Sequence, residues 1–300
     1  MSLPLPALNG SEPLAFLAAL GALRGAARRW PEAKLSWSGS AFFQPTLHFE
    51  SEVAPEELVG ALIEACRATL ELEAFTALGS DVKVSPDIFR DHLVRLSELD
   101  DASTLESLEY FAAFGSDAVA DGSGKKLKPT ALHMTAGQQQ FLDMAKQLLR
   151  ETKPEQMHAA LFSAWDYQDP GPAMRWDTSG ERLYALEARN PSSNAARTVR
   201  GANALGILAI PFFPVSVVGM RLRTRGFHRV GRRTEYFVWP LWKPPLSGAV
   251  INSLLGDARF AEERIDAGNL KASGILALYR SQRDVNDHGY GTLRPVEQVF

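Results

Sequence analysis

The sequence contains little cysteine and no long apolar run, and neither sign of charge is in large excess. Among its 300 residues only Cys66 is a cysteine, so neither a disulfide framework nor a thiolate metal site can form within the chain. Cys66 lies in a helical pattern, where we expect a buried structural thiol. The 32 basic and 35 acidic residues give a formal net charge of −3, which excludes a generally cationic, histone-like binder. Any affinity for a polyanion must therefore be local.

The most apolar stretch runs from Leu14 to Leu23 and is too short to span a bilayer, which needs about 20 residues. It has no basic segment before it and no A-x-A cleavage pattern after it. We therefore expect a cytoplasmic protein without a membrane partner. The hydrophobic fraction of 45% and the charged fraction of 22% are typical of a folded globular chain with a sizeable core.

Periodicity predicts an α+β fold, with mixed antiparallel sheet segments, amphipathic helices and a helical hairpin insertion. Glu12 and Pro13 after Ser11 indicate the start of an amphipathic helix that packs on a sheet. Two alternating segments joined by a polar stretch, 33–40 and 45–51, predict a hairpin. Three parts are expected, with one continuous domain as the alternative. They are an N-terminal α/β part (1–114), an exposed basic loop (115–129), and a helical hairpin followed by a C-terminal α+β part (130–300).

The second half of the chain is expected to begin with two short helices. Thr135 and Gln138 have the spacing of a capping box for the first helix, and Pro154 begins the second. A short strand is expected within 181–191. Further on, the apolar alternation predicts one strand over residues 215–227 and its partner strand over residues 234–243. Residues 226–233 are expected to connect these two strands, and residues 274–285 are expected to form the final strand.

The segment RLRTRGFHRVGRR, residues 221–233, concentrates positive charge in this mildly acidic chain. Arg221, Arg223 and Arg225 share one face of the predicted strand, since alternate residues of a strand point the same way. Acids are scarce here until Glu235, so we expect little local neutralisation. Arginine binds phosphate bidentately, which favours a nucleic-acid backbone as ligand. The alternative is a solvated hairpin whose charges protect a sheet edge.

A second basic segment, GSGKKLK, lies in the predicted loop. It lacks the glycine spacing and the Ser/Thr after Lys that a Walker-type site needs, so we expect a loop that touches a phosphate backbone, or a plain linker. The candidate nucleic-acid-binding residues are Arg221, Arg223, Arg225, His228, Arg229, Arg232, Arg233, Lys125, Lys126 and Lys128.

Other chemical signals are weak. Asp166, Asp169 and Asp177 lie among prolines and glycines, where aspartate caps turns, and no histidine lies nearby for a metal site. The histidines form no His-Asp doublet and no H-E-x-x-H motif. Trp239 and Trp242 could stack on bases, but we expect them to be structural residues in the core or at an interface. We expect no catalytic residue, no metal and no cofactor.

Three segments carry a family resemblance. LNGSEPLAFLAALGALR, at residues 8–24, resembles the N-terminal pattern of CRISPR-associated proteins from type I-U/I-G loci. WDTSGERLYAL and RGANALGILAIPFFP resemble segments of the small, large-subunit-like family in that group. The resemblance implies a large-subunit-like component of a Cascade surveillance complex that helps recognise the motif adjacent to the target and handles duplex DNA. Base pairing by the crRNA then reads the sequence.

The implied partners are crRNA, target DNA and other Cascade subunits. No His-Asp nuclease motif or helicase motif is found, so cutting would fall to another protein. The leading hypothesis is a non-catalytic effector subunit that binds the nucleic-acid backbone. Two alternatives remain, a crRNA-processing endoribonuclease with His228 as its base, and a protein–protein scaffold subunit.

Overall fold

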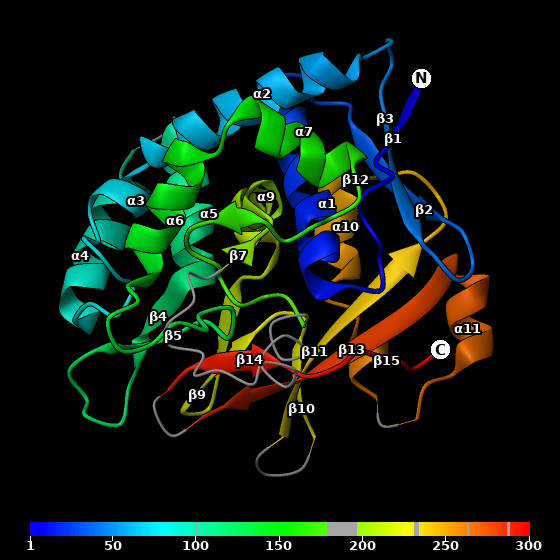
Figure 1. Ribbon diagram of the computed structural model, residues 1–300. Helices are drawn as coiled ribbons and strands as arrows, with labels where there is room; N and C mark the ends of the chain where they lie inside the picture. The colour runs from blue at the N-terminus through cyan, green and yellow to red at the C-terminus, as the bar shows by residue number, and fades with distance from the viewer. Residues whose placement is uncertain (100, 179–196, 231–233, 263, 287–288) are drawn as a thin grey trace, which may run out of the picture.

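Helices and antiparallel sheets occupy separate regions of the molecule, so the expected α+β class is confirmed (Figure 1). Most helices lie in the upper left of Figure 1, and the strands lie along its right and lower sides. The structure is a computed structural model that describes residues 1–99, 101–178, 197–230, 234–262, 264–286 and 289–300.

The N-terminal strands form a four-stranded antiparallel sheet with a strand from late in the chain, in the order β1-β3-β2-β12. Strands β2 and β3 are the hairpin that the alternating pattern predicted, with Leu35 opposite Leu47 and Trp37 opposite Pro45. These apolar pairs are buried, and they hold the register because a shift by one residue would expose them. The strands are β1 (Ser2–Pro4), β2 (Lys34–Ser38), β3 (Gln44–His48) and β12 (Leu246–Ser247).

The second sheet is built from the C-terminal part of the chain around two long central strands, β11 and β13. Trp239 in β11 lies opposite Tyr279 in β13, and their rings stack with centroids 5.9 Å apart. The expected final strand is β13, but two short strands follow it and pair back onto it. The strands are β10 (Phe227–Val230), β11 (Thr234–Trp242), β13 (Ile275–Val285), β14 (Gly291–Leu293) and β15 (Glu297–Gln298).

Helix α1 (Pro13–Ala27) is buried almost all round, so the prediction of an amphipathic helix was wrong. One side packs on the sheets as expected, because Phe16 stacks on Trp37 of β2 with centroids 6.0 Å apart. The other side meets α9 (Arg200–Leu208), whose nine residues are all buried. A Cβ added at Gly21 would lie 1.8 Å from the carbonyl oxygen of Leu205, so the two backbones nearly touch.

Three further helices cover α9. Helices α6 and α7 both pack on α2 and on α9. The predicted capping box at Thr135 was wrong, since α6 begins at Phe141 and the Thr135 hydroxyl is buried without a hydrogen-bond partner among the described residues. The Phe141 N–H donates instead to Asp81 Oδ2 at 3.4 Å, a cap from a distant loop that the local sequence does not reveal. The helices are α2 (Pro55–Leu70), α6 (Phe141–Glu151) and α7 (Pro154–Phe162).

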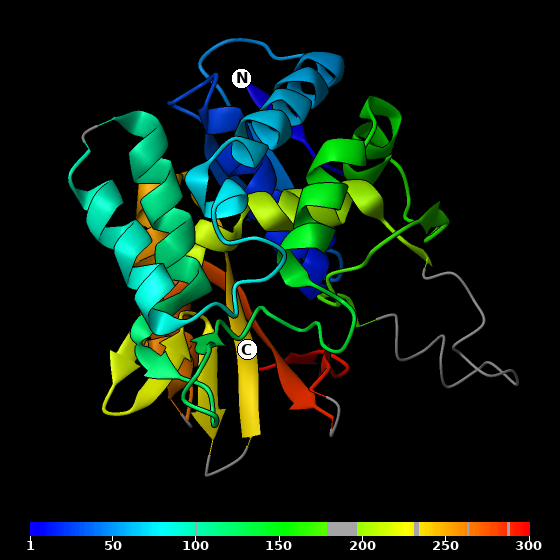
Figure 2. The same cartoon turned by 90° about the vertical axis from the view of Figure 1, so that its left-hand side faces the viewer.

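Residues 115–129 form a two-stranded hairpin, which corrects the expected exposed loop. The hairpin is stabilised because Val119 and Leu127 are buried, while the polar residues of the turn between the strands are exposed to solvent. It follows a pair of helices that Figure 2 shows at the left of the molecule. The elements are α3 (Glu73–Thr76), α4 (Pro86–Ser97), α5 (Ala102–Phe114), β4 (Gly115–Ala120) and β5 (Leu127–Pro129).

Buried apolar side chains from all three expected parts of the chain belong to one hydrophobic cluster. Cys66 lies in it as expected, and burial raises the pKa of its thiol to about 12. Both tryptophans of β11 are also buried. Trp239 Nε1 donates to the Gly10 carbonyl at 2.8 Å, and Trp242 Nε1 donates to the Leu35 carbonyl at 2.8 Å. The structural interpretation of these two side chains is confirmed.

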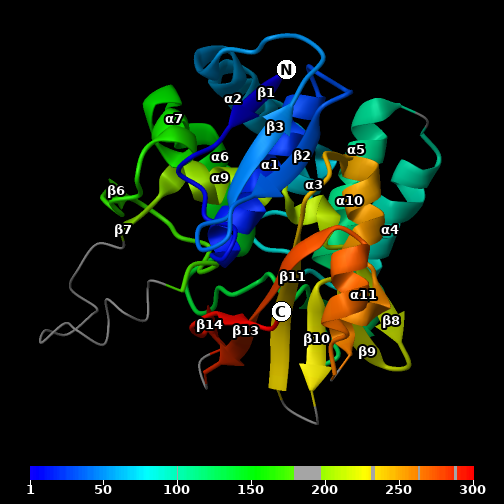
Figure 3. The same ribbon diagram turned by 90° about the vertical axis from the view of Figure 1, so that its right-hand side faces the viewer.

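Two short helices complete the C-terminal side of the molecule (Figure 3). Helix α10 (Gly248–Leu254) follows β12 directly, and α11 (Ala267–Ala272) packs on β13. The strand expected within 181–191 lies outside the described residues. Among the helices that the structure does describe, none has both the length and the apolar character needed to cross a lipid bilayer.

Candidate nucleic-acid interface

The first three arginines of the basic segment lie on and just after a hairpin of two short strands, β8 (Val215–Val218) and β9 (Arg221–Thr224). The sequence predicted one strand here, but the chain reverses at Gly219, whose φ of 60° allows a tight turn, so β9 pairs with β8. Arg221 and Arg223 are exposed, while Leu222 and Thr224 between them are buried. The two guanidinium groups therefore share one solvent face, as predicted.

The predicted connection 226–233 is also partly strand, because residues 227–230 form β10 and pair with β11. The expected partnership of the arginine strand with β11 was therefore wrong. The local alternation identified strands correctly, but it contains no information on which strand pairs with which. Arg232 and Arg233 lie outside the described residues.

The β4–β5 hairpin packs directly against the β8–β9 hairpin (Figures 1 and 2). Buried Thr224 Oγ1 accepts a hydrogen bond from the Ala131 N–H at 2.8 Å and lies 3.2 Å from Thr130 Oγ1. Lys125 and Lys126 are exposed at the turn, and Lys128 is half-buried in β5. The fold thus places two basic segments, about 95 residues apart in the sequence, on adjacent hairpins.

Two predicted arginines are held by the protein itself. Arg225 is half-buried and donates to both the carbonyl oxygen and the side-chain oxygen of Asn252, and burial lowers its pKa. Arg229 Nε lies 3.5 Å from Glu235 Oε1, which stands directly opposite it across β10 and β11. The same carboxylate binds Arg283 at 3.1 Å. The expectation of little neutralisation was therefore wrong for Arg229, because strand pairing brings Glu235 beside it.

His228 lies in β10 next to this cluster and is half-buried. Burial lowers its pKa below the ordinary value, and the nearby charge of Arg223 lowers it further. The neutral form of the ring therefore predominates at pH 7. Among the described residues, no carboxylate or hydroxyl group forms a hydrogen bond with the ring that would orient it as a catalytic base.

Five of the predicted cations make no ion pair with any described residue. The acids close to them are occupied: Asp117 binds Arg90 Nε at 2.8 Å, and Asp121 closes the β4–β5 turn. Hydrogen bonds from Ser123 and from turn amides lower the pKa of Asp121, so it remains ionised within the turn. The five cations, together called the basic surface below, are Arg221, Arg223, Lys125, Lys126 and Lys128.

The structure also locates the weaker candidates. Asp169 accepts hydrogen bonds from Gln156 Nε2 at 2.7 Å and from the Arg200 N–H at 2.8 Å, so it anchors α7 and α9. No group of three His, Cys, Asp or Glu side chains suited to a metal ion is present in the described ranges. Lys83, which sequence reasoning missed, lies beside Lys126 although it is 43 residues upstream in the sequence. An isolated lysine gives no sequence signal for such a position.

Comparison with family models and with curated proteins found no similar protein. The chain matches no family model and no curated protein.

Proposed function

We propose that the protein binds the phosphate backbone of nucleic acid through the basic surface, as a non-catalytic subunit of a type I CRISPR effector. The observation that carries this proposal is the docking of two basic hairpins side by side, with five cations that make no ion pair among the described residues. The resemblance of three segments to large-subunit-like proteins of type I-U/I-G loci supports crRNA or target DNA as the polyanion, and other effector subunits as protein partners.

The geometry of β9 suits a repeating anionic ligand. Arg221 and Arg223 are two residues apart on one strand face, so their backbones are about 7 Å apart. The planar guanidinium group binds phosphate oxygens in a bidentate manner. The lysines of the adjacent turn widen the same cationic area, whereas the net charge of −3 over the chain discourages polyanions from binding elsewhere. Binding is therefore expected to be local and electrostatic.

Salt titration of binding to a single-stranded oligonucleotide tests the proposal. If four to five cations meet phosphates of the single strand, log affinity falls against log salt with a slope of roughly −3 to −4, and each of Arg221→Ala and Arg223→Ala makes the slope shallower by about 0.7. Arg67→Ala is the matched control, because Arg67 is exposed on α2 and makes no ion pair among the described residues. A flat salt response, or equal effects of all three variants, contradicts the proposal.

Two experimental results would favour the alternative functions over nucleic-acid binding by a non-catalytic subunit. Specific, metal-independent cleavage of repeat RNA that is lost in His228→Ala would identify an endoribonuclease. Unchanged nucleic-acid affinity after charge reversal at Arg221 and Arg223 would leave a protein–protein scaffold. Both measurements use the purified 300-residue chain, with thermal unfolding of each variant as the check on folding.

A further inference from the structure

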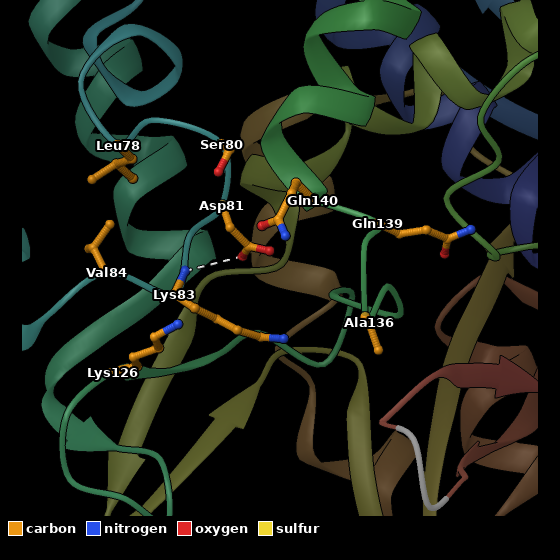
Figure 4. Close-up of a pocket in the computed structure, with 10 residues that line it drawn as sticks. Leu78, Ser80, Asp81, Lys83, Val84, Lys126, Ala136, Gln139 and Gln140 are labelled. Atoms are coloured by element: carbon orange, nitrogen blue, oxygen red, sulfur yellow. Dashed lines mark hydrogen bonds between the residues drawn. The ribbon is translucent and has the colours of Figure 1, made fainter.

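A pocket of about 290 Å³ lies beside the basic surface, between the loop before α4, the β4–β5 turn and the segment before α6 (Figure 4). Its wall is more polar than apolar, and none of the described residues that line it is aromatic. Drug-sized ligand pockets are mostly apolar and aromatic, so this one is suited to a small polar group. It is lined by Leu78, Ser80, Asp81, Lys83, Val84, Lys126, Ala136, Gly137, Gln139 and Gln140.

Backbone hydrogen bonds hold the wall of this pocket in place. The Ser80 carbonyl accepts from the N–H groups of Leu142 and Asp143 at 3.0 and 3.1 Å. On the other side, the Leu127 N–H donates to the Val84 carbonyl at 2.8 Å. The loop is therefore attached both to the first turn of α6 and to β5. These attachments fix the positions of the side chains that it presents to the pocket.

The bond between Leu127 and Val84 brings two lysines together. Lys83 directly precedes Val84, Lys126 directly precedes Leu127, and both side chains line the same wall in Figure 4. Neither ammonium group forms an ion pair within the described part of the chain. Adjacent like charges without a counterion repel each other and destabilise the fold. An anion held between them removes this repulsion.

The one acid among the described lining residues does not neutralise the lysine ammonium groups. Asp81 Oδ1 is 2.9 Å from His133 Nε2 and accepts from the Lys83 backbone N–H at 3.2 Å, and the Phe141 N–H binds its other oxygen. His133 is buried and stacks on Phe141 with ring centroids 5.0 Å apart, which fixes this arrangement. Burial would raise the pKa of Asp81, but the hydrogen bonds outweigh it and lower the pKa. The carboxylate is therefore turned to the protein interior.

We infer that this pocket binds a phosphate monoester, held by Lys83 and Lys126 with hydrogen bonds from Ser80 and the amide of Gln140. The absence of an aromatic platform in the lining argues against a stacked base as the occupant. Because Lys126 belongs to both the pocket and the basic surface, the phosphate is the terminal phosphate of a strand that runs along that surface. This last step rests on the proposed function.

The test compares three forms of one oligonucleotide, carrying a 5′-phosphate, a 3′-phosphate, or hydroxyl groups at both ends. One phosphorylated form binds the wild-type protein about tenfold more tightly than the hydroxyl form, because a charge-assisted hydrogen bond contributes about 1.5 kcal/mol or more. Lys83→Gln abolishes this difference and leaves the affinity for the hydroxyl form almost unchanged. Lys243→Gln is the matched control, since Lys243 is exposed and does not line the pocket.

The outcomes separate the pocket from the basic surface. If the hydroxyl form binds with the expected salt slope and neither phosphate adds affinity, the pocket inference is overturned and the proposed function stands. If no oligonucleotide binds, titration with inorganic phosphate and with a mononucleotide shows whether the pocket binds a phosphate group. Saturable binding that is lost in Lys83→Gln supports a pocket for free phosphate esters, and its absence overturns the inference. Equal loss in Lys243→Gln overturns it as well.

Discussion

Gly21 allows the closest backbone approach between α1 and α9, the two buried helices at the centre of the molecule. Its missing side chain leaves room for the Leu205 carbonyl, which a Cβ would meet at 1.8 Å. The contact cannot relax by a rotamer change, because the obstacle is backbone. The pattern of leucines in α1 indicated a helix, but it could not indicate which of its glycines touches another helix.

Gly21→Ala should lower the free energy of unfolding by about 3 kcal/mol or more, since overpacking forces the two helices apart. Gly60→Ala is the matched control. Gly60 is exposed in α2 with no atom within 4 Å of the added Cβ, so this change should raise stability by up to about 1 kcal/mol through helix propensity. Urea denaturation followed by circular dichroism measures both. Equal effects would rule out the close approach of α1 and α9.

His228 should couple nucleic-acid binding to pH. Its pKa is lowered by burial and by Arg223, so the ring is neutral at pH 7. A phosphate that neutralises Arg223 raises this pKa again, and the complex therefore binds a proton that the free protein lacks. Affinity should rise further in wild type than in His228→Gln when the pH is lowered from 7.5 to about 6. Fluorescence anisotropy at fixed salt measures this, with His158→Gln as the control. The same pH profile in His228→Gln would contradict it.

The same lowering of the His228 pKa determines how this residue makes the stability of the fold depend on pH. Because the folded pKa of His228 lies below the unfolded value of about 6.5, the unfolded chain takes up a proton first as the pH falls. The contribution of the neutral ring is therefore complete above about pH 6.5 and is lost as the pH falls towards the folded pKa. Binding and folding respond to acid in opposite directions at this residue.

At the scale of elements, the contact between the β4–β5 and β8–β9 hairpins assembles the candidate site. It depends on Thr224, a buried side chain in the middle of an otherwise charged segment. Its hydroxyl satisfies the Ala131 N–H, so the hydrogen bond links the end of one hairpin to the edge of the other. Neither segment contains a sequence pattern that specifies this neighbour.

Thr224→Val should lower the free energy of unfolding by about 1–3 kcal/mol, because the Ala131 N–H loses its acceptor in a buried position. It should also weaken oligonucleotide binding, since the lysines and arginines no longer share a fixed surface. Thr46→Val is the control, as Thr46 is a half-buried strand residue whose hydroxyl bonds no described residue. Chemical denaturation and anisotropy are the two readouts. Unchanged binding in folded Thr224→Val would show that the hairpins act independently.

Element boundaries show the same limit on sequence reasoning. The N-terminal hairpin and the helices beginning at Pro13 and Pro154 were predicted well, because apolar periodicity and proline at the first helical position are local signals. The start of α6 was misplaced, because Asp81 supplies its cap from 60 residues away. The hairpin over 115–129 was taken for a loop, because only two of its side chains are well buried within strands that are short and polar.

At the scale of the whole molecule, an acidic chain places five cations that pair with no described acid on two adjacent hairpins. The basic surface was predicted residue by residue, but its membership changed in the folded chain. Arg225 binds Asn252 and Arg229 binds Glu235, so neither arginine belongs to the basic surface. The electrostatic field that a polyanion meets depends on which cations are already paired. That depends on contacts between segments distant in the sequence.

The sequence by itself determined the class of fold, the burial of Cys66 and of the two tryptophans of β11, and the presence of two basic segments. These follow from composition and from periods of two and 3.6 residues, which act over one element. Only the tertiary structure decided which strands pair, that the two basic hairpins lie together, and that Lys83 and Lys126 share a pocket. Pairing and docking are set by shape and hydrogen-bond complementarity between distant segments, and no local pattern encodes them.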